Sequence, residues 1–274
     1  MSETVSRKLV EQVLAIAEQA GQAILEIYNQ RDPVEVETKS DDSPVTAADQ
    51  AAHRIIVDQL SALTPDIPIF SEESEAVEYS ERQKWNPYWL VDPLDGTKEF
   101  INRTGEFTVN IALIEDNEPV AGVVTVPLKD QAYVGGQGVG AHKIDAGQWQ
   151  EIKVRKVPGK ELVVVGSRRH GAERLNKILE NMGTQGYETD MTSMGSSLKF
   201  CLIAEGKADV YPRLAPTSEW DTAAAQAVLM EAGGRVVATD FSPLTYNRKE
   251  SVLNPEFFAL GDPDMDWKEL LKDQ

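Results

Sequence analysis

The segment LVDPLDGT at residues 90–97 constrains the fold of this chain more than any other stretch. An apolar run, typical of a buried strand, leads directly into two carboxylates, Asp92 and Asp95, that are three residues apart. Acids clustered at a strand end repel each other, and a hard divalent cation offsets that repulsion. The proline between them stiffens the turn, and the glycine after them lets a ligand approach the backbone closely. With the hydroxyl of Thr97 beside them, the segment predicts a metal-dependent phosphate site.

Hydrophobic periodicity predicts two structurally different halves of the chain. In the first half, helical spacing indicates two helices, the second opened by a capping-box pattern at Thr46 and Asp49. Their ranges are 6–28 and 46–63, with strands expected at 34–38, 67–70, 108–114, 120–126 and 131–134. The glycine-rich residues 135–147 are interpreted as a turn or a connection between lobes. In the second half strands and helices alternate, with strands at 162–165 and 208–211 and helices at 172–182, 196–205 and 221–232.

These two halves predict the α/β fold class, with an α+β first lobe over residues 1–147 and an α/β second lobe over residues 148–274. A chain of 274 residues with 41% hydrophobic residues can bury a sizeable core, and no apolar run approaches the length of a membrane span. The N-terminal residues lack an apolar signal region. We therefore expect a cytoplasmic protein without a transmembrane segment, either a monomer or a homodimer, with peripheral association with the inner membrane left open.

Charge and cysteine content exclude several kinds of partner and metal. Asp and Glu number 45 against 27 Lys and Arg, and the net charge of −18 repels nucleic-acid polymers and anionic lipids. A small anionic substrate remains compatible, because bound metal and local cations invert the field within a cleft. Cys201 is the only cysteine, which excludes an internal disulfide and a cysteine-rich zinc site. The three histidines show no ligand spacing, so oxygen ligands and Mg²⁺ are favoured over zinc or copper.

Each acidic element also has a purely structural explanation. Glu72 and Glu73 begin an acidic run that a solvated surface would carry equally well, and Asp49 could be only the acidic arm of its capping box. Asp221 could be only the N-cap of the helix that follows it. The acidic pair in segment 90–97 is harder to explain in this way, because it directly follows a buried strand.

Three separated motifs resemble the signatures of the inositol monophosphatase superfamily, whose members are lithium-sensitive, Mg²⁺-dependent phosphatases. The motifs are EE at 72–73, DPLDGT at 92–97 and WDTAA at 220–224. The resemblance implies the layered αβαβα sandwich fold of the inositol monophosphatase and fructose-1,6-bisphosphatase type. Four further stretches are most similar to the 3'(2'),5'-bisphosphate nucleotidases of this superfamily: VGSRRH at 165–170, GSSLKF at 195–200, YPR at 211–213 and YNRKESVLNP at 246–255.

The resemblance implies a set of metal ligands at matching positions. One Mg²⁺ would be held by Glu72, Asp92 and the carbonyl of Leu94, and a second by Asp92, Asp95 and Asp221. A third, weaker Mg²⁺ would use Glu72 together with Asp49. The expected cofactor is therefore two or three Mg²⁺ ions, and the second lobe contributes one of the ligands.

The resemblance also implies roles in catalysis. Thr97, oriented by Asp49, would help to activate the attacking water, and Glu72 completes the expected catalytic set. The backbone N–H groups of Gly96 and Thr97 would bind the phosphate that is cleaved. Glu73 matches the acidic pair of the family, but the role of a solvated neighbour is preferred for it.

The implied substrate is adenosine 3',5'-bisphosphate, a nucleotide bisphosphate of sulfur assimilation, which would be hydrolysed to AMP and phosphate. Its second phosphate must be held without being cleaved, a task that suits basic side chains. The candidates are Arg168, Arg169, His170, Lys199, Arg213 and Arg248, of which we expect two or three to be contacts. Hydrogen bonds are expected from Ser167, Gly195 and Ser196, and Glu219 is a candidate for the sugar site. The residues Glu72, Leu94, Asp95 and Asp221 are expected to touch the substrate as well.

Other classes of protein remain open at this point. An inositol or sugar monophosphatase on the same fold is the nearest alternative. A haloacid-dehalogenase phosphatase uses a nucleophilic aspartate in a motif whose acids are two residues apart, whereas these are three apart. A cysteine phosphatase is disfavoured because Cys201 lacks the surrounding signature. A non-enzymatic metal-binding or interaction protein with an acidic surface would show no turnover at all.

Overall fold

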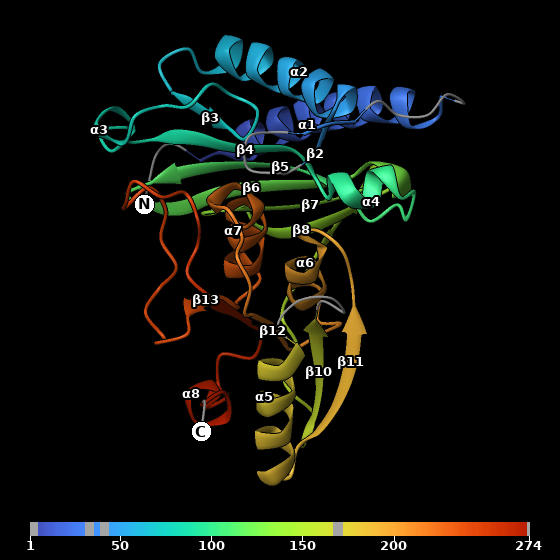
Figure 1. Cartoon of the computed structure of the whole chain (residues 1–274), viewed down its shortest axis with the longest axis vertical. Coiled ribbons are helices and arrows are strands. Elements are labelled where there is room, and N and C mark those ends of the chain that lie inside the picture. Colours follow the sequence, from blue (N-terminus) through green and yellow to red (C-terminus); the bar gives the residue numbers. More distant parts are fainter. Residues whose placement is uncertain (1–4, 31–35, 39–43, 167–171, 273–274) are drawn as a thin grey trace.

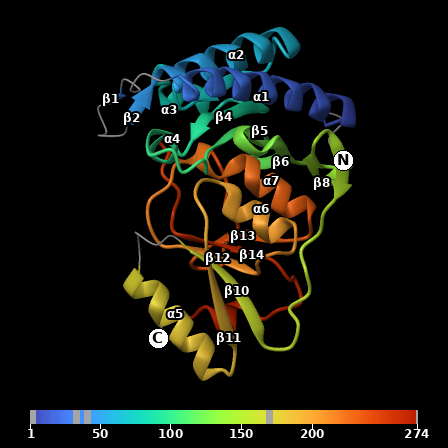
Figure 2. The same ribbon diagram turned by 90° about the vertical axis from the view of Figure 1, so that its right-hand side faces the viewer.

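The computed structural model describes residues 5–30, 36–38, 44–166 and 172–272. These residues form five layers that follow one another along the long axis of the molecule (Figure 1 and Figure 2). A pair of long helices covers a seven-stranded sheet, two helices separate this sheet from a five-stranded sheet, and two further helices cover the outer face of the second sheet. The predicted αβαβα sandwich is confirmed.

The outer helix layer consists of α1 (Arg7–Tyr28) and α2 (Ala47–Leu63). Ser6 caps α1 by accepting the N–H of Leu9 at 3.1 Å, which satisfies one of the free donors at the helix start. The predicted capping box at Thr46 and Asp49 is present at the start of α2. A short antiparallel pair, β1 (Val36–Thr38) and β2 (Pro44–Thr46), leads into α2.

The seven-stranded sheet has the strand order β3-β4-β5-β6-β7-β8-β9, and only its first pair is parallel. The strands are β3 (Ile69–Ser71), β4 (Tyr88–Asp95), β5 (Thr108–Glu115), β6 (Glu118–Val126), β7 (Gln131–Gly136), β8 (Gly140–Asp145) and β9 (Gln148–Glu151). Short helices connect them: α3 (Tyr79–Arg82), α4 (Thr97–Ile101) and the 3₁₀ turn η1 (Pro127–Lys129). The pairing of β4 with β5 shifts between Asp92 and Asp95, so both acids lie on an irregular strand end.

The five-stranded sheet is mixed, with the order β11-β10-β12-β14-β13. Its strands are β10 (Glu161–Gly166), β11 (Glu188–Ser193), β12 (Val210–Arg213), β13 (Arg235–Ala238) and β14 (Phe257–Leu260). The remaining helices are α5 (Ala172–Thr184), α6 (Leu198–Ala204), the 3₁₀ turn η2 (Glu219–Asp221), α7 (Ala223–Glu231) and α8 (Trp267–Leu270). Strand β10 is parallel to β11 and β12, while β14 is antiparallel to β12 and β13.

Helix α7 lies in the middle layer, and its side chains are buried on every side except near its last turn. It touches the first sheet so closely that two strands carry glycine at the contact. A Cβ on Gly122 of β6 would lie 2.1 Å from the carbonyl oxygen of Ala224, and one on Gly135 of β7 would lie 2.6 Å from the Cα of Val228. Only a residue without a side chain fits at either position, because the clash would be with helix backbone.

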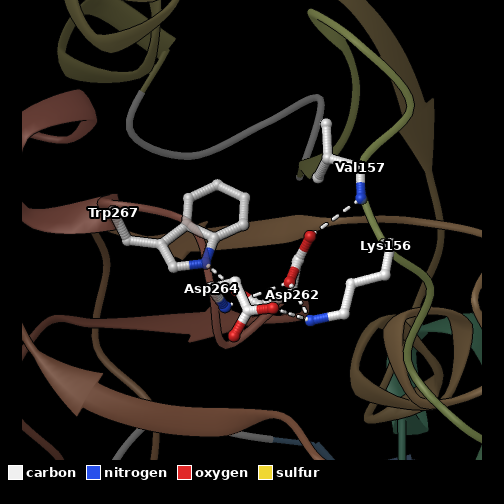
Figure 3. Close-up of polar contacts among 5 residues, drawn as sticks. All are labelled: Lys156, Val157, Asp262, Asp264 and Trp267. Atoms are coloured by element: carbon white, nitrogen blue, oxygen red, sulfur yellow. Dashed lines mark hydrogen bonds and ion pairs between the residues drawn. The ribbon is translucent and has the colours of Figure 1, made fainter.

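A polar cluster ties the connection between the two sheets to the C-terminal segment (Figure 3). The carboxylate of Asp262 accepts hydrogen bonds from Lys156 Nζ at 3.0 Å and from the backbone N–H of Val157 at 2.9 Å. The indole N–H of Trp267 donates to the carbonyl of Asp262 at 2.7 Å, and Asp264 forms a second ion pair with Lys156. The cluster anchors the fully buried Trp267, and with it α8, under the second sheet.

Several predicted elements differ from those observed. Residues 135–147 do contain a turn, at 137–139, but they do not connect the lobes: they hold the end of β7 and all of β8, and β9 follows after a second turn. The helix expected at 221–232 is shorter, since α7 begins at Ala223 and η2 precedes it. Strands β11, β13 and β14 and helix α8 lack a clear apolar period and were not predicted. The division into lobes at residue 147 stays a prediction.

Within the described ranges, no helix combines the length and the apolar composition that crossing a membrane requires.

Candidate active site

Strand β4 brings its two aspartates to the interface between the first sheet and the middle helix layer. The side chain of Asp92 is 1% exposed, and its Oδ1 accepts the backbone N–H of Leu94 at 3.1 Å. The Oδ2 of Asp95 accepts the backbone N–H of Ser197 at 2.6 Å, immediately before α6. The irregular strand end therefore turns one acid inward and joins the other to the second half of the chain.

The carboxylates of the site raise one another's pKa values. Burial raises the pKa of Asp92 well above its usual value, and the negative charges of Glu72, Asp95, Asp221 and Asp49 raise it further. Burial, with the charge of Asp95, raises the pKa of Asp221 to about 8. Burial also raises the pKa of Asp95, although the Lys199 ammonium opposes this. The predicted cluster is thus assembled from β4, the end of β3 and η2, and its ionised form needs a compensating positive charge.

These residues fit a hard divalent cation by the chemistry of their donors, since the cluster offers carboxylate and carbonyl oxygens. In the part of the chain that the structure describes, no three His, Cys, Asp or Glu side chains are grouped so that they could hold a metal ion by themselves. Mg²⁺ usually keeps several water ligands and needs only one or two protein carboxylates. The ligand set therefore stays a prediction, supported by the mutual charge effects.

Asp49 serves its capping box and Thr97 at the same time. Its Oδ2 accepts the backbone N–H of Thr46 at 2.8 Å and the hydroxyl of Thr46 at 2.7 Å, while its Oδ1 accepts the hydroxyl of Thr97 at 3.1 Å. Burial raises the pKa of Asp49, and the hydrogen bonds from Thr46 partly oppose this. The structural and the functional interpretation of Asp49 are thus compatible, because Oδ2 forms the capping box while Oδ1 binds the hydroxyl of Thr97.

Gly96 is the N-cap residue of helix α4, and Thr97 is its first residue. Gly96 adopts φ +94°, the left-handed region, and a Cβ there would lie 3.1 Å from the carbonyl oxygen of Glu106. A glycine is required at this position for both reasons.

Asp221 belongs to η2 rather than to the start of α7, so the prediction that it opens the helix is wrong. Its Oδ2 accepts the backbone N–H of Ser218 at 2.9 Å in a second capping box. This hydrogen bond engages one of the two carboxylate oxygens of Asp221.

Glu72 and Glu73 follow β3 directly and are both half-buried. The backbone N–H of Glu72 donates to the carbonyl of Val91 at 3.0 Å, which places Glu72 beside Asp92 on the neighbouring strand. The carboxylate of Glu73 instead accepts Gln50 Nε2 from α2 at 3.1 Å. The backbone of Glu72 is thus held beside Asp92, whereas the side chain of Glu73 is bound to α2.

A cavity of about 430 Å³ opens beside the carboxylates. Its lining includes acids from both halves of the chain together with basic and hydroxyl groups of the second half: Asp95, Asp221, Lys199, Arg213, Gly195 and Ser196. Such a volume suits a small organic ligand. The structure therefore places six of the twelve described candidate substrate residues in the lining of one cavity. The described candidates outside this lining are Glu72, Leu94, Gly96, Thr97, Glu219 and Arg248.

Lys199 is the basic group most deeply inserted in this cavity. It is 7% exposed, its Nζ donates to the carbonyl of Ser196 at 2.7 Å, and it lies 5.3 Å from the centre of the Tyr211 ring. Burial lowers its pKa to about 8, and the charge of Asp95 partly opposes this. A buried ammonium of this kind gains most from an anionic ligand.

The loop before α6 has an unusual conformation. Ser196 adopts φ +48°, and its buried hydroxyl has no hydrogen-bond partner among the described residues. The N–H of Gly195 donates to the carboxylate of Glu106 at 2.6 Å, and a Cβ on Gly195 would lie 2.9 Å from that side chain. The loop thus holds an unpaired, buried hydroxyl next to the cavity on a constrained backbone.

Of three other charged candidates, Glu219 and Arg248 are not among the described residues that line the cavity, whereas Arg213 is. The buried carboxylate of Glu219 accepts the N–H of Asn247, so its role at the sugar site stays a prediction that the cavity lining does not support. Burial raises the pKa of Glu219 to about 7. Arg248 is exposed and donates to Asn117 Oδ1 at 3.3 Å, away from the cavity. Arg213 lines the cavity, but its guanidinium donates two hydrogen bonds to the carbonyls of Ala215 and Pro216.

Four candidates, namely Ser167, Arg168, Arg169 and His170, lie outside the described residues.

Sequence reasoning missed part of the cavity wall. Lys98, Glu99 and Glu106 come from α4 and the loop after it, and no motif pointed to them. The aromatic rings of Tyr211 and Phe257 pack at 5.8 Å in perpendicular planes and line the same cavity. Only YPR at 211–213, quoted above, gave a signal for this wall.

Comparison with known proteins matches this geometry to one family over nearly the whole chain. Residues 6–268 match the inositol monophosphatase family. The 3'(2'),5'-bisphosphate nucleotidase CysQ of Salmonella typhimurium is 50% identical over 249 residues, 91% of this chain and 98% of that protein. The CysQ nucleotidase of Escherichia coli K12 is 49% identical over the same shares of both chains. The crystal structure of CysQ from Bacteroides thetaiotaomicron has a TM-score of 0.82 at 38% identity and covers 93% of this chain and 97% of that one.

Proposed function

Because the chain belongs to the inositol monophosphatase family, we propose that its carboxylate cluster and cavity form the active site of a 3'(2'),5'-bisphosphate nucleotidase. The reaction is hydrolysis of the 3'-phosphate of adenosine 3',5'-bisphosphate to give AMP and phosphate. The observation that supports it most is the buried Lys199 ammonium in the cavity beside the carboxylates. A fixed cation there suits the second phosphate, which must be held and not cleaved. The resemblance predicted from the sequence is confirmed.

The proposed metal ligands are those that the sequence predicted. Glu72, Asp92 and the carbonyl of Leu94 would hold one Mg²⁺, and Asp92, Asp95 and Asp221 a second, while Glu72 and Asp49 would hold a weaker third. The chemistry that Mg²⁺ supplies when bound is a lower pKa of a water molecule and neutralisation of the charge on the phosphate. The mutual rise of pKa among Asp92, Asp95 and Asp221 supports this set.

Thr97 and Asp49 would handle the proton of the attacking water. Thr97 Oγ1 donates to Asp49 Oδ1, so its lone pairs remain available to accept a hydrogen bond from the water. A proton taken by Thr97 Oγ1 would be balanced by the transfer of its own proton to Asp49 Oδ1. Thr46 fixes the other oxygen of Asp49 and thereby keeps Oδ1 turned toward Thr97.

Substrate position would be set by backbone and side-chain donors on either side of the reacting phosphorus. The N–H groups of Gly96 and Thr97 at the start of α4 would bind the phosphate that is cleaved. Lys199, Arg213 and the free hydroxyl of Ser196 would hold the other end of the nucleotide. Binding energy at this remote end orients the 3'-phosphate toward the carboxylates.

A substrate panel tests the proposal. Purified protein with Mg²⁺ is given adenosine 3',5'-bisphosphate, adenosine 2',5'-bisphosphate, inositol 1-phosphate and a sugar phosphate, with and without Li⁺, and phosphate release is measured. We expect the 3',5'-bisphosphate to be hydrolysed with the highest kcat/KM, and Li⁺ to inhibit. Faster release from inositol or sugar phosphates would contradict the proposal and would favour a monophosphatase on the same fold.

The charge of Lys199 gives a prediction for pH. Since its pKa is about 8, the ammonium is present at pH 7 and is lost as pH rises through 8. The KM for adenosine 3',5'-bisphosphate should therefore rise above pH 8. Lys199→Met should lower kcat/KM by about 10- to 100-fold at pH 7, the worth of a hydrogen bond to a charged group, and should remove that rise in KM.

Lys98→Met provides the matched control, because Lys98 lines the same cavity but its side chain is exposed. It should change kcat/KM by less than about threefold, as an exposed charge contributes little. Equal losses in the two variants would show that only the overall charge of the cavity matters, against the specific role of Lys199.

A further inference from the structure

A buried arginine lies outside the cavity and has no part in the mechanism above. Arg82, the last residue of α3, is 2% exposed, and its guanidinium lies 5.5 Å from the ring centre of Phe70 and 4.9 Å from that of Tyr79. A charge buried among aromatic rings is costly unless hydrogen bonds and an opposite charge compensate it. The guanidinium of Arg82 therefore needs such partners.

The hydrogen bonds that its guanidinium makes within the described part of the chain go to one loop near the C-terminus. Its NH1 donates to Asn247 Oδ1 at 2.5 Å, and its NH2 donates to the carbonyls of Lys249, at 3.1 Å, and of Glu250. Asn247 Nδ2 donates back to the carbonyl of Arg82 at 2.6 Å. The two residues, 165 positions apart in sequence, thus form a reciprocal pair that joins α3 to this loop.

Asn247 continues the connection to a buried carboxylate. Its backbone N–H donates to both oxygens of Glu219, at 3.1 and 3.0 Å, and Glu219 is 2% exposed. Asn247 adopts φ +54°, a conformation that asparagine tolerates better than most residues. The guanidinium of Arg82 and the carboxyl group of Glu219 therefore stand at the two ends of one hydrogen-bonded chain, with Asn247 between them.

Each end of this chain lies close to a proposed metal ligand. Glu219 is the first residue of η2 and Asp221 is the third. At the other end, Arg82 packs on Phe70, which lies in β3 two positions before Glu72. The ring of Phe70 also meets that of Trp220, at 5.8 Å, so the two segments touch directly.

We propose that Arg82, Asn247 and Glu219 form a brace that sets the position of Glu72 relative to Asp221 and thereby the affinity of the site for Mg²⁺. The inference rests on the proposed function, because it takes Glu72 and Asp221 as ligands. The three brace residues are positioning residues, since neither Glu219 nor Arg82 lines the cavity in the described ranges. Metal affinity commonly falls 10- to 100-fold when an outer group that orients a ligand is lost.

The test is calorimetric titration with Mg²⁺ alone, which needs no turnover. Arg82→Met and Glu219→Gln should each weaken Mg²⁺ binding about 10-fold or more. Glu219→Gln keeps the volume of the side chain, so it remains informative if Arg82→Met does not fold. In assays, raising Mg²⁺ should restore kcat, and KM for adenosine 3',5'-bisphosphate at saturating Mg²⁺ should change less than about twofold.

Arg155→Met is the matched control. Arg155 makes a two-pronged ion pair with the fully buried Asp209, at 2.8 and 2.6 Å, and neither residue lines the cavity among those described. It should lower the thermal midpoint as the brace variants do, yet leave Mg²⁺ affinity unchanged. A merely structural role for Arg82 would make the two arginine variants alike.

The possible failures are distinguishable. Unchanged Mg²⁺ affinity in folded Arg82→Met and Glu219→Gln proteins would overturn the brace, whatever the substrate. Weakened affinity in a protein that hydrolyses no bisphosphate would support the brace and contradict the proposed nucleotidase. Equal weakening in Arg155→Met would overturn the brace as well, because general destabilisation would then explain the effect.

Discussion

Replacing Asp92 with asparagine is expected to abolish turnover and to make the metal-free protein more stable. Asp92 is shared by both principal Mg²⁺ sites proposed above, and a metal contributes several kcal/mol to stabilising the transition state. At about 1.4 kcal/mol per tenfold change, its loss should lower kcat/KM by about 10³-fold or more. Asparagine keeps the acceptor for the N–H of Leu94, so the strand end should be retained.

The gain in stability follows from the titration of Asp92. Burial and the neighbouring acids raise its pKa in the folded protein, so its ionised form opposes folding. The raised pKa means that this cost is absent at low pH and grows as pH rises. The thermal midpoint of the variant should therefore exceed that of the parent by about 3 °C or more at pH 8 without Mg²⁺, and the difference should vanish toward pH 4.

Asp209→Asn gives the contrasting control at an equally buried aspartate. The carboxylate of Asp209 is bound by Arg155 and also accepts the N–H of Val163 at 2.7 Å. Removing its charge weakens the pairing with the partly exposed guanidinium, at a cost of about 1–3 kcal/mol. Exchange of aspartate for asparagine should thus stabilise the metal-free protein at position 92 and destabilise it at position 209.

Turnover of Asp92→Asn within tenfold of the parent would contradict the proposed ligand role.

Gly122→Ala is expected to be among the most destabilising single substitutions in the chain. Its Cβ would lie 2.1 Å from the carbonyl oxygen of Ala224, 2.8 Å from that residue's carbonyl carbon and 2.9 Å from its Cα. These are backbone atoms of α7 and cannot move by a change of rotamer. Forcing β6 away from α7 opens the core between the layers, and we expect a loss of about 3 kcal/mol or more in the free energy of unfolding.

Gly183→Ala is the matched control for this prediction. Gly183 lies in α5, and a Cβ there would meet nothing within 4 Å. Alanine is favoured over glycine in a helix by up to about 1 kcal/mol, so this variant should be neutral or more stable. Urea denaturation of both variants gives the comparison. A Gly122→Ala protein within about 1 kcal/mol of the parent would show that the layers separate readily.

The sequence allowed prediction of elements whose signal is local. The capping box at Thr46 and Asp49, the long α1 and the strand that ends in Asp92 and Asp95 all follow from short patterns. Strands β13 and β14 could not be predicted in this way. Strand β14 is buried on both faces, so apolar residues do not alternate with polar ones along it. The glycines of residues 135–147 were interpreted as a turn, whereas Gly135 and Gly136 end β7 and Gly140 begins β8.

The site was predictable where motifs carried it, and not where tertiary packing did. Asp221 was recognised as an acid of the site, but its capping box with Ser218 depends on η2, which has no clear pattern. Glu219 was taken for a sugar contact because it adjoins the motif, whereas its partner, Asn247, lies 28 residues away. Glu106 was missed for the same reason, since the N–H it accepts comes from Gly195.

The close seating of α7 on the first sheet has a consequence for motion. The two sheets share one helix layer, and at Gly122 and Gly135 the strands touch helix backbone with no side chain between them. Because no side chain separates α7 from β6 and β7 at these two contacts, we expect α7 to move together with the first sheet as one rigid unit. Any adjustment to a bound nucleotide should then arise outside this unit, in loops and side-chain rotamers or between α7 and the second sheet.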